Sequence, residues 1–365
     1  MGDVLDELFG LLKRLTEAFG VSGYEDDVRG VVIDELRGVA DSVEVDSLGN
    51  VIAVKKGEGG LRLLLDAHMD EIGFFVRYID ERGFVYLSPI GGWWDPIVLG
   101  QRVRIRTDDG RLVYGVVGSK PPHLLKPEER EKVVPLDRLF VDIGASSREE
   151  VESLGIRVGS PVDLDRDTIR LAGDRVTGKA MDDRAGVAAL ISAFKAIDGQ
   201  EADVYLVVAT QEEVGLKGAR VAAYRVAPHV GIAVDVTTAN DVPGAEARDQ
   251  VARVGGGPAL TVADGRSSSG LISHPKLLKL LLDTAREAGI PVQLSILPGG
   301  TTDGAVIALT REGVPTATVS IPTRYIHSPV ELLSLRDLEY TSRLIVEATK
   351  RVTKEWYEAN IGPLD

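Results

Sequence analysis

Apolar residues recur at helical spacing over the first part of the chain. Across residues 3–19 they stand three or four positions apart, as expected for the buried face of an amphipathic helix. Ser22 and Glu25 have the spacing of a capping box, and a second helical pattern follows them as far as Leu36. We therefore expect two helices before the first strand, with Ser22 and Glu25 capping the second helix.

Short runs rich in apolar and β-branched residues follow these helices. Strands are predicted around Val43, over residues 51–54 and over residues 61–65, the last of them buried. Between about Ile72 and Leu164 there are only short β-rich runs broken by Gly, Pro and Asp, without a long helical period. This texture predicts a small β-barrel or β-sandwich.

From about Asp167 onward, predicted strands and helices alternate. Helices are expected over residues 183–196, 216–225, 275–288 and 333–352, and strands over residues 204–210, 230–236, 291–297 and 314–321. Such alternation predicts an α/β fold in three layers, with a mixed sheet covered by helices on both faces. We expect residues 1–71 and 165–365 to form this domain, and residues 72–164 to be a β-rich domain inserted into it.

Composition and charge narrow the chemistry. The 365 residues include no cysteine, which excludes disulfides, thiolate metal ligands and a cysteine nucleophile. The formal net charge of -14 would repel a phosphate backbone, so nucleic acid is not an expected partner. No stretch offers the roughly 20 apolar residues of a membrane span, and the amino terminus lacks the pattern of a signal peptide. We therefore expect a cytoplasmic protein without a membrane partner.

Residue types that bind metal ions follow the predicted strands. They are His68 and Asp70, Asp182 and Asp183, Glu212 and Glu213, Asp235, and His327. In open α/β sheets, ligands bind beyond the carboxyl ends of the strands, so these side chains are expected to meet. Each motif alone is common on protein surfaces. Their joint placement is what predicts a site.

This set contains the ligands that a pair of divalent ions needs. Two ions about 3.5–4 Å apart require a carboxylate that bridges them and terminal ligands on each side. We expect Asp182 to bridge, His68 and Asp235 to complete one ion, and Glu213 and His327 to complete the other. Imidazole and carboxylate ligands suit Zn²⁺, Co²⁺ and Mn²⁺, and zinc is the first choice.

Two more carboxylates are predicted to be catalytic. The ions would polarise a scissile carbonyl and lower the pKa of a bridging water, whose proton a non-ligating carboxylate must take. Glu212 is predicted to be this general base, because in an extended chain its side chain points away from that of Glu213. Asp70 is predicted to hydrogen-bond the second nitrogen of His68 and fix its tautomer, and the alternative is an acid that caps the loop.

The chain resembles the tetrahedral (TET) aminopeptidases, relatives of the glutamyl and deblocking aminopeptidases among the co-catalytic zinc exopeptidases. The matching stretches are residues 66–73, 178–184, 210–215, 233–236, 298–303 and 325–328. The resemblance implies the roles given above for each site residue. It also implies a PDZ-like dimerisation domain in the insert, dimers assembled into a hollow dodecamer, and a cis peptide bond between Asp182 and Asp183.

The predicted function is the removal of amino-terminal residues from peptides. A deacylase or carboxypeptidase on the same core would use similar ligands. A non-catalytic oligomeric shell is a further alternative, and the intact ligand set argues against it.

Two residues outside the predicted site each have two interpretations. His123 could reach an active site or contact another subunit, and Asp241 could bind the amino group of a substrate or cap its own loop.

Overall fold

The computed structural model describes residues 2–364, so Met1 and Asp365, the outer ends of the predicted domain ranges, lie outside it. The helices are α1 (Gly2–Glu17), α2 (Asp26–Leu36), α3 (Pro127–Arg130), α4 (Arg148–Ser153), α5 (Met181–Ala196), α6 (Lys217–Val226), α7 (Pro275–Ala288), α8 (Gly304–Ile307), α9 (Leu335–Thr349) and α10 (Lys354–Asn360). The strands are β1 (Ser42–Val45), β2 (Val51–Lys55), β3 (Arg62–His68), β4 (Gly73–Ile79), β5 (Val85–Ile90), β6 (Arg102–Arg106), β7 (Leu112–Gly118), β8 (Phe140–Asp142), β9 (Pro161–Leu164), β10 (Ile169–Arg170), β11 (Arg175–Gly178), β12 (Asp203–Ala209), β13 (Val230–Thr238), β14 (Ala259–Asp264), β15 (Gln293–Leu297), β16 (Thr316–Thr323) and β17 (Glu331–Ser334).

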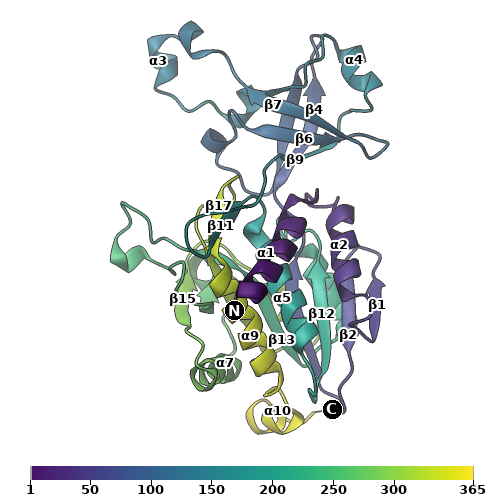
Figure 1. The fold of residues 1–365 in the computed structure, drawn as a ribbon, viewed down its shortest axis with the longest axis vertical. Coiled ribbons are helices and arrows are strands. Elements are labelled where there is room, and N and C mark those ends of the chain that lie inside the picture. The colour runs from purple at the N-terminus through teal and green to yellow at the C-terminus, as the bar shows by residue number, and fades with distance from the viewer. Residues whose placement is uncertain (1, 365) are drawn as a thin grey trace.

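An eight-stranded mixed sheet forms the centre of the larger domain, in the order β1-β2-β12-β3-β13-β16-β14-β15 (Figure 1). The side chains of strand β3 show why helices cover both faces of the sheet. Leu63 and Leu65 pack with α5, α7 and α9 on one face, whereas Leu64 faces α6 and α8 on the other. Because side chains alternate along a strand, a run of apolar residues is buried on both faces. The predicted three-layer α/β fold is confirmed.

The smaller domain is a closed barrel in the strand order β4-β5-β8-β7-β6-β9, and it lies above the sheet in Figure 1. Its interior is filled by a separate cluster of buried apolar side chains, which includes Phe74, Val103 and Val162. The predicted β-rich insert is therefore a barrel and not a sandwich. Its strands lie within the range 72–164 given from the sequence, although the domain limits themselves stay a prediction.

The capping box predicted at Ser22 and Glu25 is wrong. Helix α2 begins at Asp26, and Glu25 makes no capping hydrogen bond to it. The hydroxyl of Ser22 instead donates to Oδ2 of Asp70 at 2.6 Å. A hydrogen bond to a carboxylate is stronger than one with a backbone amide, so the hydroxyl of Ser22 binds Asp70 instead of capping α2.

No helix within residues 2–364 has the length and apolar character needed to cross a membrane.

Candidate metal centre

The central strands of the sheet bring the candidate residues to one edge. Strands β12, β3, β13 and β16 are mutually parallel along β12-β3-β13-β16, so their carboxyl ends lie together. His68 is the last residue of β3, and Asp235 lies near the end of β13. Glu212 and Glu213 follow β12, and His327 follows β16. The site is thus assembled from strands that are distant in sequence and adjacent in the sheet.

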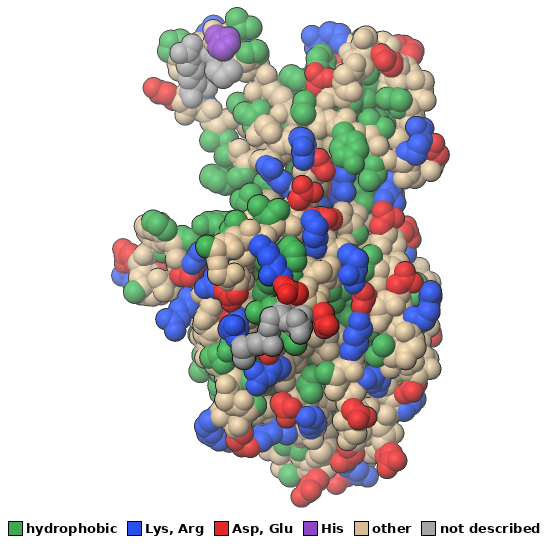
Figure 2. All heavy atoms as spheres, in the orientation of Figure 1, with side chains coloured by type: hydrophobic (Ala, Val, Ile, Leu, Met, Phe, Trp, Pro, Cys, Tyr) green, Lys and Arg blue, Asp and Glu red, His purple; other side chains and the backbone are tan. Residues whose placement is uncertain are grey.

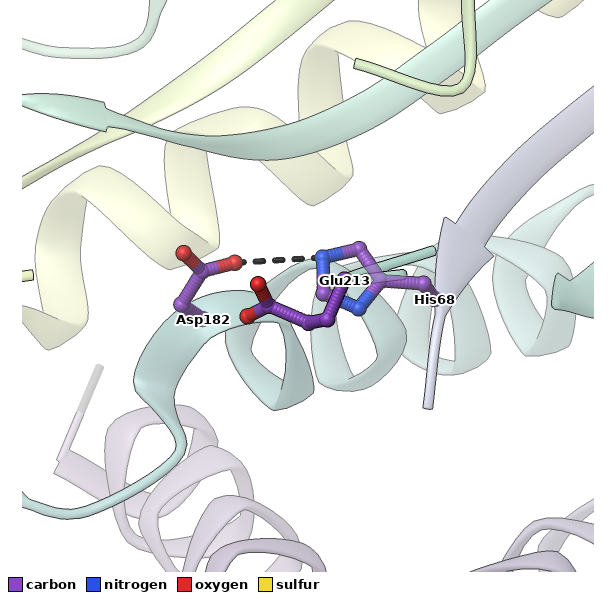
Figure 3. Close-up of side chains that lie close together, drawn as sticks. All are labelled: His68, Asp182 and Glu213. Atoms are coloured by element: carbon purple, nitrogen blue, oxygen red, sulfur yellow. Dashed lines mark hydrogen bonds and ion pairs between the residues drawn. The ribbon is translucent and has the colours of Figure 1, made fainter. Parts of the chain in front are cut away.

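Asp182 lies between the two histidines. Its Oδ1 is 3.1 Å from Nε2 of His68, and its Oδ2 is 3.4 Å from Nε2 of His327. Figure 3 shows the carboxylates of Asp182 and Glu213 side by side, both on the same side of the ring of His68. Each oxygen of Asp182 therefore faces a different imidazole, as a carboxylate that bridges two ions must.

The other candidate ligands divide between the same two histidines. Asp235 Oδ1 and Glu212 Oε2 each lie 3.8 Å from Nε2 of His68, whereas Glu213 Oε2 lies 3.2 Å from Nε2 of His327. Ligand atoms of His68, Asp182 and Glu213 all lie within 4.8 Å of one another, so these residues could hold a metal ion. The structure thus brings all the predicted ligands together, and the neighbouring side chains of Glu212 and Glu213 diverge.

Asp70 has a wider role than the sequence indicated. Nδ1 of His68 lies 3.2 Å from the carbonyl oxygen of Asp70 and 3.5 Å from its carboxylate Oδ1. The same carboxylate accepts the backbone N–H groups of Glu212 and Glu213, at 2.9 and 3.2 Å. Asp70 therefore orients His68 and also fixes the loop that carries both glutamates.

Two further carboxylates support the site: Glu331, which the sequence did not single out, and Asp183, which was named there without a role of its own. Glu331, the first residue of β17, accepts the backbone N–H of His327 at 2.7 Å and that of Asp182 at 3.1 Å. Asp183 accepts the backbone N–H of His68 at 3.3 Å, and the peptide bond between Asp182 and Asp183 is cis, as the resemblance implied. Glu331 lies only four residues after His327 but 149 residues after Asp182, and no local pattern shows that it links the two.

Burial dominates the electrostatics of these carboxylates. It raises the pKa of Glu212 and Asp235 well above the ordinary values and raises that of Glu331 to about 8. Burial also opposes ionisation of Asp182, but the contacts with His327 and His68 outweigh it and lower its pKa. A cation beside these carboxylates would oppose the rise in pKa that burial causes. The donor set of imidazole nitrogens and crowded carboxylate oxygens therefore fits divalent metal ions.

A cavity of about 190 Å³ opens beside the cluster. Six ionisable residues line it: His68, Asp182, Glu212, Glu213, Asp235 and His327. The other lining residues come from the end of β13, from Leu297 and residues 300–302, and from Ile326. Asp241 does not line this cavity, since its carboxylate binds Arg324 through two contacts of 2.7 Å and accepts the N–H of Val254. Of its two alternatives, the structure supports the loop contact.

Comparisons with known proteins agree with this geometry. The family model for M42 glutamyl aminopeptidase matches residues 49–344. Lysyl aminopeptidase of Pyrococcus furiosus is 41% identical over 337 residues, which cover 92% of this chain and 94% of that protein. Aminopeptidase APDkam598 of the archaeon Desulfurococcus kamchatkensis has a TM-score of 0.95 at 45% identity, with 99% of each chain covered. The TET1 peptidase of Pyrococcus horikoshii has a TM-score of 0.83 at 34% identity, covering 94% of this chain and 99% of that one.

These matches extend over nearly the whole chain, and they confirm the resemblance predicted from its motifs. The barrel, the cluster of histidines and carboxylates, and the strands of the central sheet other than β1 all lie within the residues that the family model matches. The chain therefore belongs to the M42 glutamyl aminopeptidase family and is an aminopeptidase, a hydrolase of peptide bonds.

Proposed function

We propose that this chain removes amino-terminal residues from peptides with a pair of divalent metal ions. Asp182 would bridge the ions, His68 and Asp235 would complete one of them, and Glu213 and His327 the other. The observation that carries the proposal is the position of Asp182, whose two oxygens face the imidazoles of His68 and His327 at 3.1 and 3.4 Å. A carboxylate shared in this way is what two neighbouring ions require.

The surroundings of the ligands support the same proposal. Oε1 of Glu213 is buried and has no hydrogen-bond partner among residues 2–364, so it is available to a cation. Zn²⁺, Co²⁺ and Mn²⁺ suit these nitrogen and oxygen ligands, and zinc is our first choice. When bound, such ions polarise the scissile carbonyl and lower the pKa of a water molecule between them.

Glu212 would carry the proton of this water. Its Oε2 lies 3.8 Å from Nε2 of His68, and its backbone N–H is held by Asp70 at 2.9 Å. Burial raises the pKa of Glu212, which favours the protonated form after the water has been deprotonated. Glu212 would then deliver the proton to the departing amine, while Asp70 keeps both Glu212 and His68 in position.

Replacing the proposed base tests this function. The Glu212→Gln protein should keep two metal ions per chain, because Glu212 is not a ligand, and its kcat should fall by about 10³-fold, within the range for loss of a general base. Metal content and peptide hydrolysis are measured on the same sample. Near-normal turnover with both ions bound would contradict the assignment. Hydrolysis of acetylated peptides, or release of carboxyl-terminal residues, would favour the deacylase and carboxypeptidase alternatives.

We also propose that the barrel makes dimers and that these dimers assemble into a hollow dodecamer. The Pyrococcus horikoshii TET1 peptidase is described as assembling into a tetrahedron or a large octahedral shell. In this chain the barrel exposes large apolar side chains, including Trp94 at 68%, Tyr114 at 60% and Val116 at 51%, and Figure 2 shows hydrophobic groups over the barrel. Light scattering should give twelve times the mass of one chain. A monomer mass would contradict this assembly.

A further inference from the structure

The residues that line the cavity beside the metal centre are of two kinds. Six of them are the ionisable residues described above. The others, here called the neutral wall, are residues 236–238, Leu297, residues 300–302 and Ile326. These eight residues are valine, threonine, leucine, glycine and isoleucine. Among the described residues that line the cavity, the neutral wall therefore contributes no charge.

Two charged residues lie close to the neutral wall. Asp264 has no exposed surface; its Oδ1 accepts the hydroxyl of Thr301 at 2.9 Å and the N–H of Leu271 at 2.6 Å, and its Oδ2 is buried without a partner among residues 2–364. Arg324, two residues before Ile326, is held by both carboxylate oxygens of Asp241. Neither residue lines the cavity. The only carboxylates among the described lining residues are therefore those of the metal centre, and a substrate side chain against the neutral wall would find neither a carboxylate nor a guanidinium there.

The position of the neutral wall makes it a determinant of specificity. In an aminopeptidase the scissile carbonyl belongs to the first residue, so the side chain of that residue must lie within a few bonds of the metal centre. The cavity of about 190 Å³ is the space that opens there. A cavity of about 150 Å³ accepts a benzene-sized group, so a leucine or phenylalanine side chain can be accommodated.

We infer that the neutral wall makes this enzyme selective for peptides whose first residue is uncharged and apolar, of about the size of leucine. The inference rests on the proposed aminopeptidase function. An ammonium or carboxylate group buried against the neutral wall would lose its hydration and would meet threonine hydroxyls, such as that of Thr237, whose Oγ1 is unpaired among residues 2–364, but no opposite charge. The family model is named for glutamyl residues and the Pyrococcus furiosus relative for lysyl residues, so membership of the family leaves this preference open.

A panel of amino-terminal amides tests the preference directly. For the metal-loaded enzyme, kcat/KM for a leucine amide should exceed that for an alanine amide by about tenfold, and those for lysine and glutamate amides by about a hundredfold. Hydrolysis of the lysine or glutamate amide as fast as the leucine amide would overturn the inference while leaving the proposed function intact. Failure to hydrolyse any free-amine substrate, with acetylated substrates hydrolysed instead, would overturn the proposed function and the inference together.

Substitution in the neutral wall tests its role. Thr238 is exposed at the end of β13 and lines the cavity, so Thr238→Asp can be made without disturbing the core. The new carboxylate should raise the kcat/KM of the lysine amide relative to the leucine amide by at least about tenfold. Leu297→Asp, at the end of β15, should act in the same direction. An unchanged ratio in both folded variants would overturn the inference.

Leu294→Asp is the matched control for the variant in β15. Leu294 lies on the same strand as Leu297 but is 56% exposed and does not line the cavity. Its substitution adds the same charge to the same strand, so the ratio of lysine to leucine hydrolysis should stay that of the unmodified enzyme. A ratio changed equally by Leu294→Asp and Leu297→Asp would show a long-range effect of charge and would overturn the assignment to the wall.

Discussion

Two buried clusters of charge meet at consecutive residues, and they are neutralised in different ways. Asp70 belongs to the metal centre, where the carboxylates form ion pairs with His68 and His327 and, among residues 2–364, with no lysine or arginine. Glu71 instead binds Nζ of Lys179 through both of its oxygens, at 2.6 and 2.8 Å, and lies 3.4 Å from Arg184. Two adjacent residues thus belong to different clusters. The cluster of Asp70 contains no lysine or arginine among the described residues, whereas that of Glu71 contains both.

The second cluster joins the barrel to the sheet domain. It consists of Glu71, Lys179, Arg184, Asp163 and Arg104, and is here called the ionic cluster. Lys179 lies 3.3 Å from Asp163 of β9, which in turn accepts Nε of Arg104 in β6 at 2.9 Å. Arg184 donates to the carbonyl oxygens of Leu15 and Gly20. These contacts pair both buried carboxylates with cations of the chain itself, and Nε of Arg184 is left without a hydrogen-bond partner among residues 2–364.

The two clusters differ in how their buried charge is compensated. Beside the metal centre, the buried carboxyl groups of Asp66 and Asp303 interact with each other and accept no hydrogen bond from another group among residues 2–364, and burial raises the pKa of Asp66 to about 7. In the ionic cluster, Lys179 and Arg184 supply the positive charge beside Glu71. Buried charge must be compensated, either by the chain itself or by an ion taken from solution.

The largest expected effect comes from removing the proposed bridge. An Asp182→Asn protein should lose most of its bound metal, because an amide is neutral and donates through its nitrogen, and its kcat should fall by more than about 10³-fold. Metal content and peptide hydrolysis measure both effects. Asp283→Asn is the control, since Asp283 only pairs with Lys279 and Arg286 on the surface of α7. Two ions retained by Asp182→Asn would refute the bridge.

Breaking the ionic cluster should instead reduce stability with metal still bound. Lys179→Met leaves Glu71 and Asp163 buried with less compensation, and the free energy of unfolding should fall by about 3 kcal/mol in urea titrations. Replacing both partners, as Lys179→Met with Glu71→Gln, should recover part of this loss, because the charge of Glu71 is removed together with that of Lys179, while Arg184 keeps the carbonyl oxygens of Leu15 and Gly20. A loss below about 1 kcal/mol in the single variant would mean that the two clusters do not differ as described.

Glu25 belongs to neither cluster and provides an intermediate case. It is buried, it accepts the N–H groups of Gly23 and Gln211 at 2.7 and 3.3 Å, and burial followed by the charge of Asp70 raises its pKa from 4.5 to about 7. A carboxyl group with a raised pKa in the folded state favours folding below its unfolded pKa. That contribution is lost as the pH rises through the folded value.

Glu25→Gln should therefore change the pH dependence of stability. The amide oxygen can still accept both N–H groups, and the buried charge is removed, so the variant should be more stable than the unmodified protein by about 2 kcal/mol at pH 8. At pH 4 the two proteins should be equally stable. Urea titrations of the metal-loaded proteins at both pH values measure this difference, and a variant less stable at pH 8 would contradict it.

The sequence was sufficient to predict which residues meet at the strand ends. It was not sufficient to predict the side chains that hold those residues in position. His68, Asp235 and Glu213 could be placed together because each follows or ends a buried strand, and parallel strands end at one edge. Glu331 and Lys179 act on partners that are 149 and 108 residues away, and no local pattern marks such pairs. The metal-binding roles themselves stay predictions.

The fold shows the same division. Long helices and the central strands were predicted because each contains enough residues for a period to be recognised. Strands β10, β11 and β17 form a separate three-stranded sheet from segments of two to four residues, and were not predicted. Strands this short form because they pair with one another, β10 with β11 and β11 with β17, and not because of a pattern in their own residues. The failed capping box at Ser22 has a similar cause, since the competing acceptor, Asp70, is 48 residues away.

The smallest effect is expected where charge pairs at the surface. Arg225 and Glu44 are 2.7 Å apart, and their side chains are 49% and 46% exposed. Water already solvates both groups, so Glu44→Gln should lower the free energy of unfolding by no more than about 0.5 kcal/mol. The effect should vanish at high salt, whereas the cost of Lys179→Met should persist because that pair is shielded from solvent. If both variants lost the same stability and responded alike to salt, burial would not be what distinguishes the ionic cluster from an ordinary surface pair.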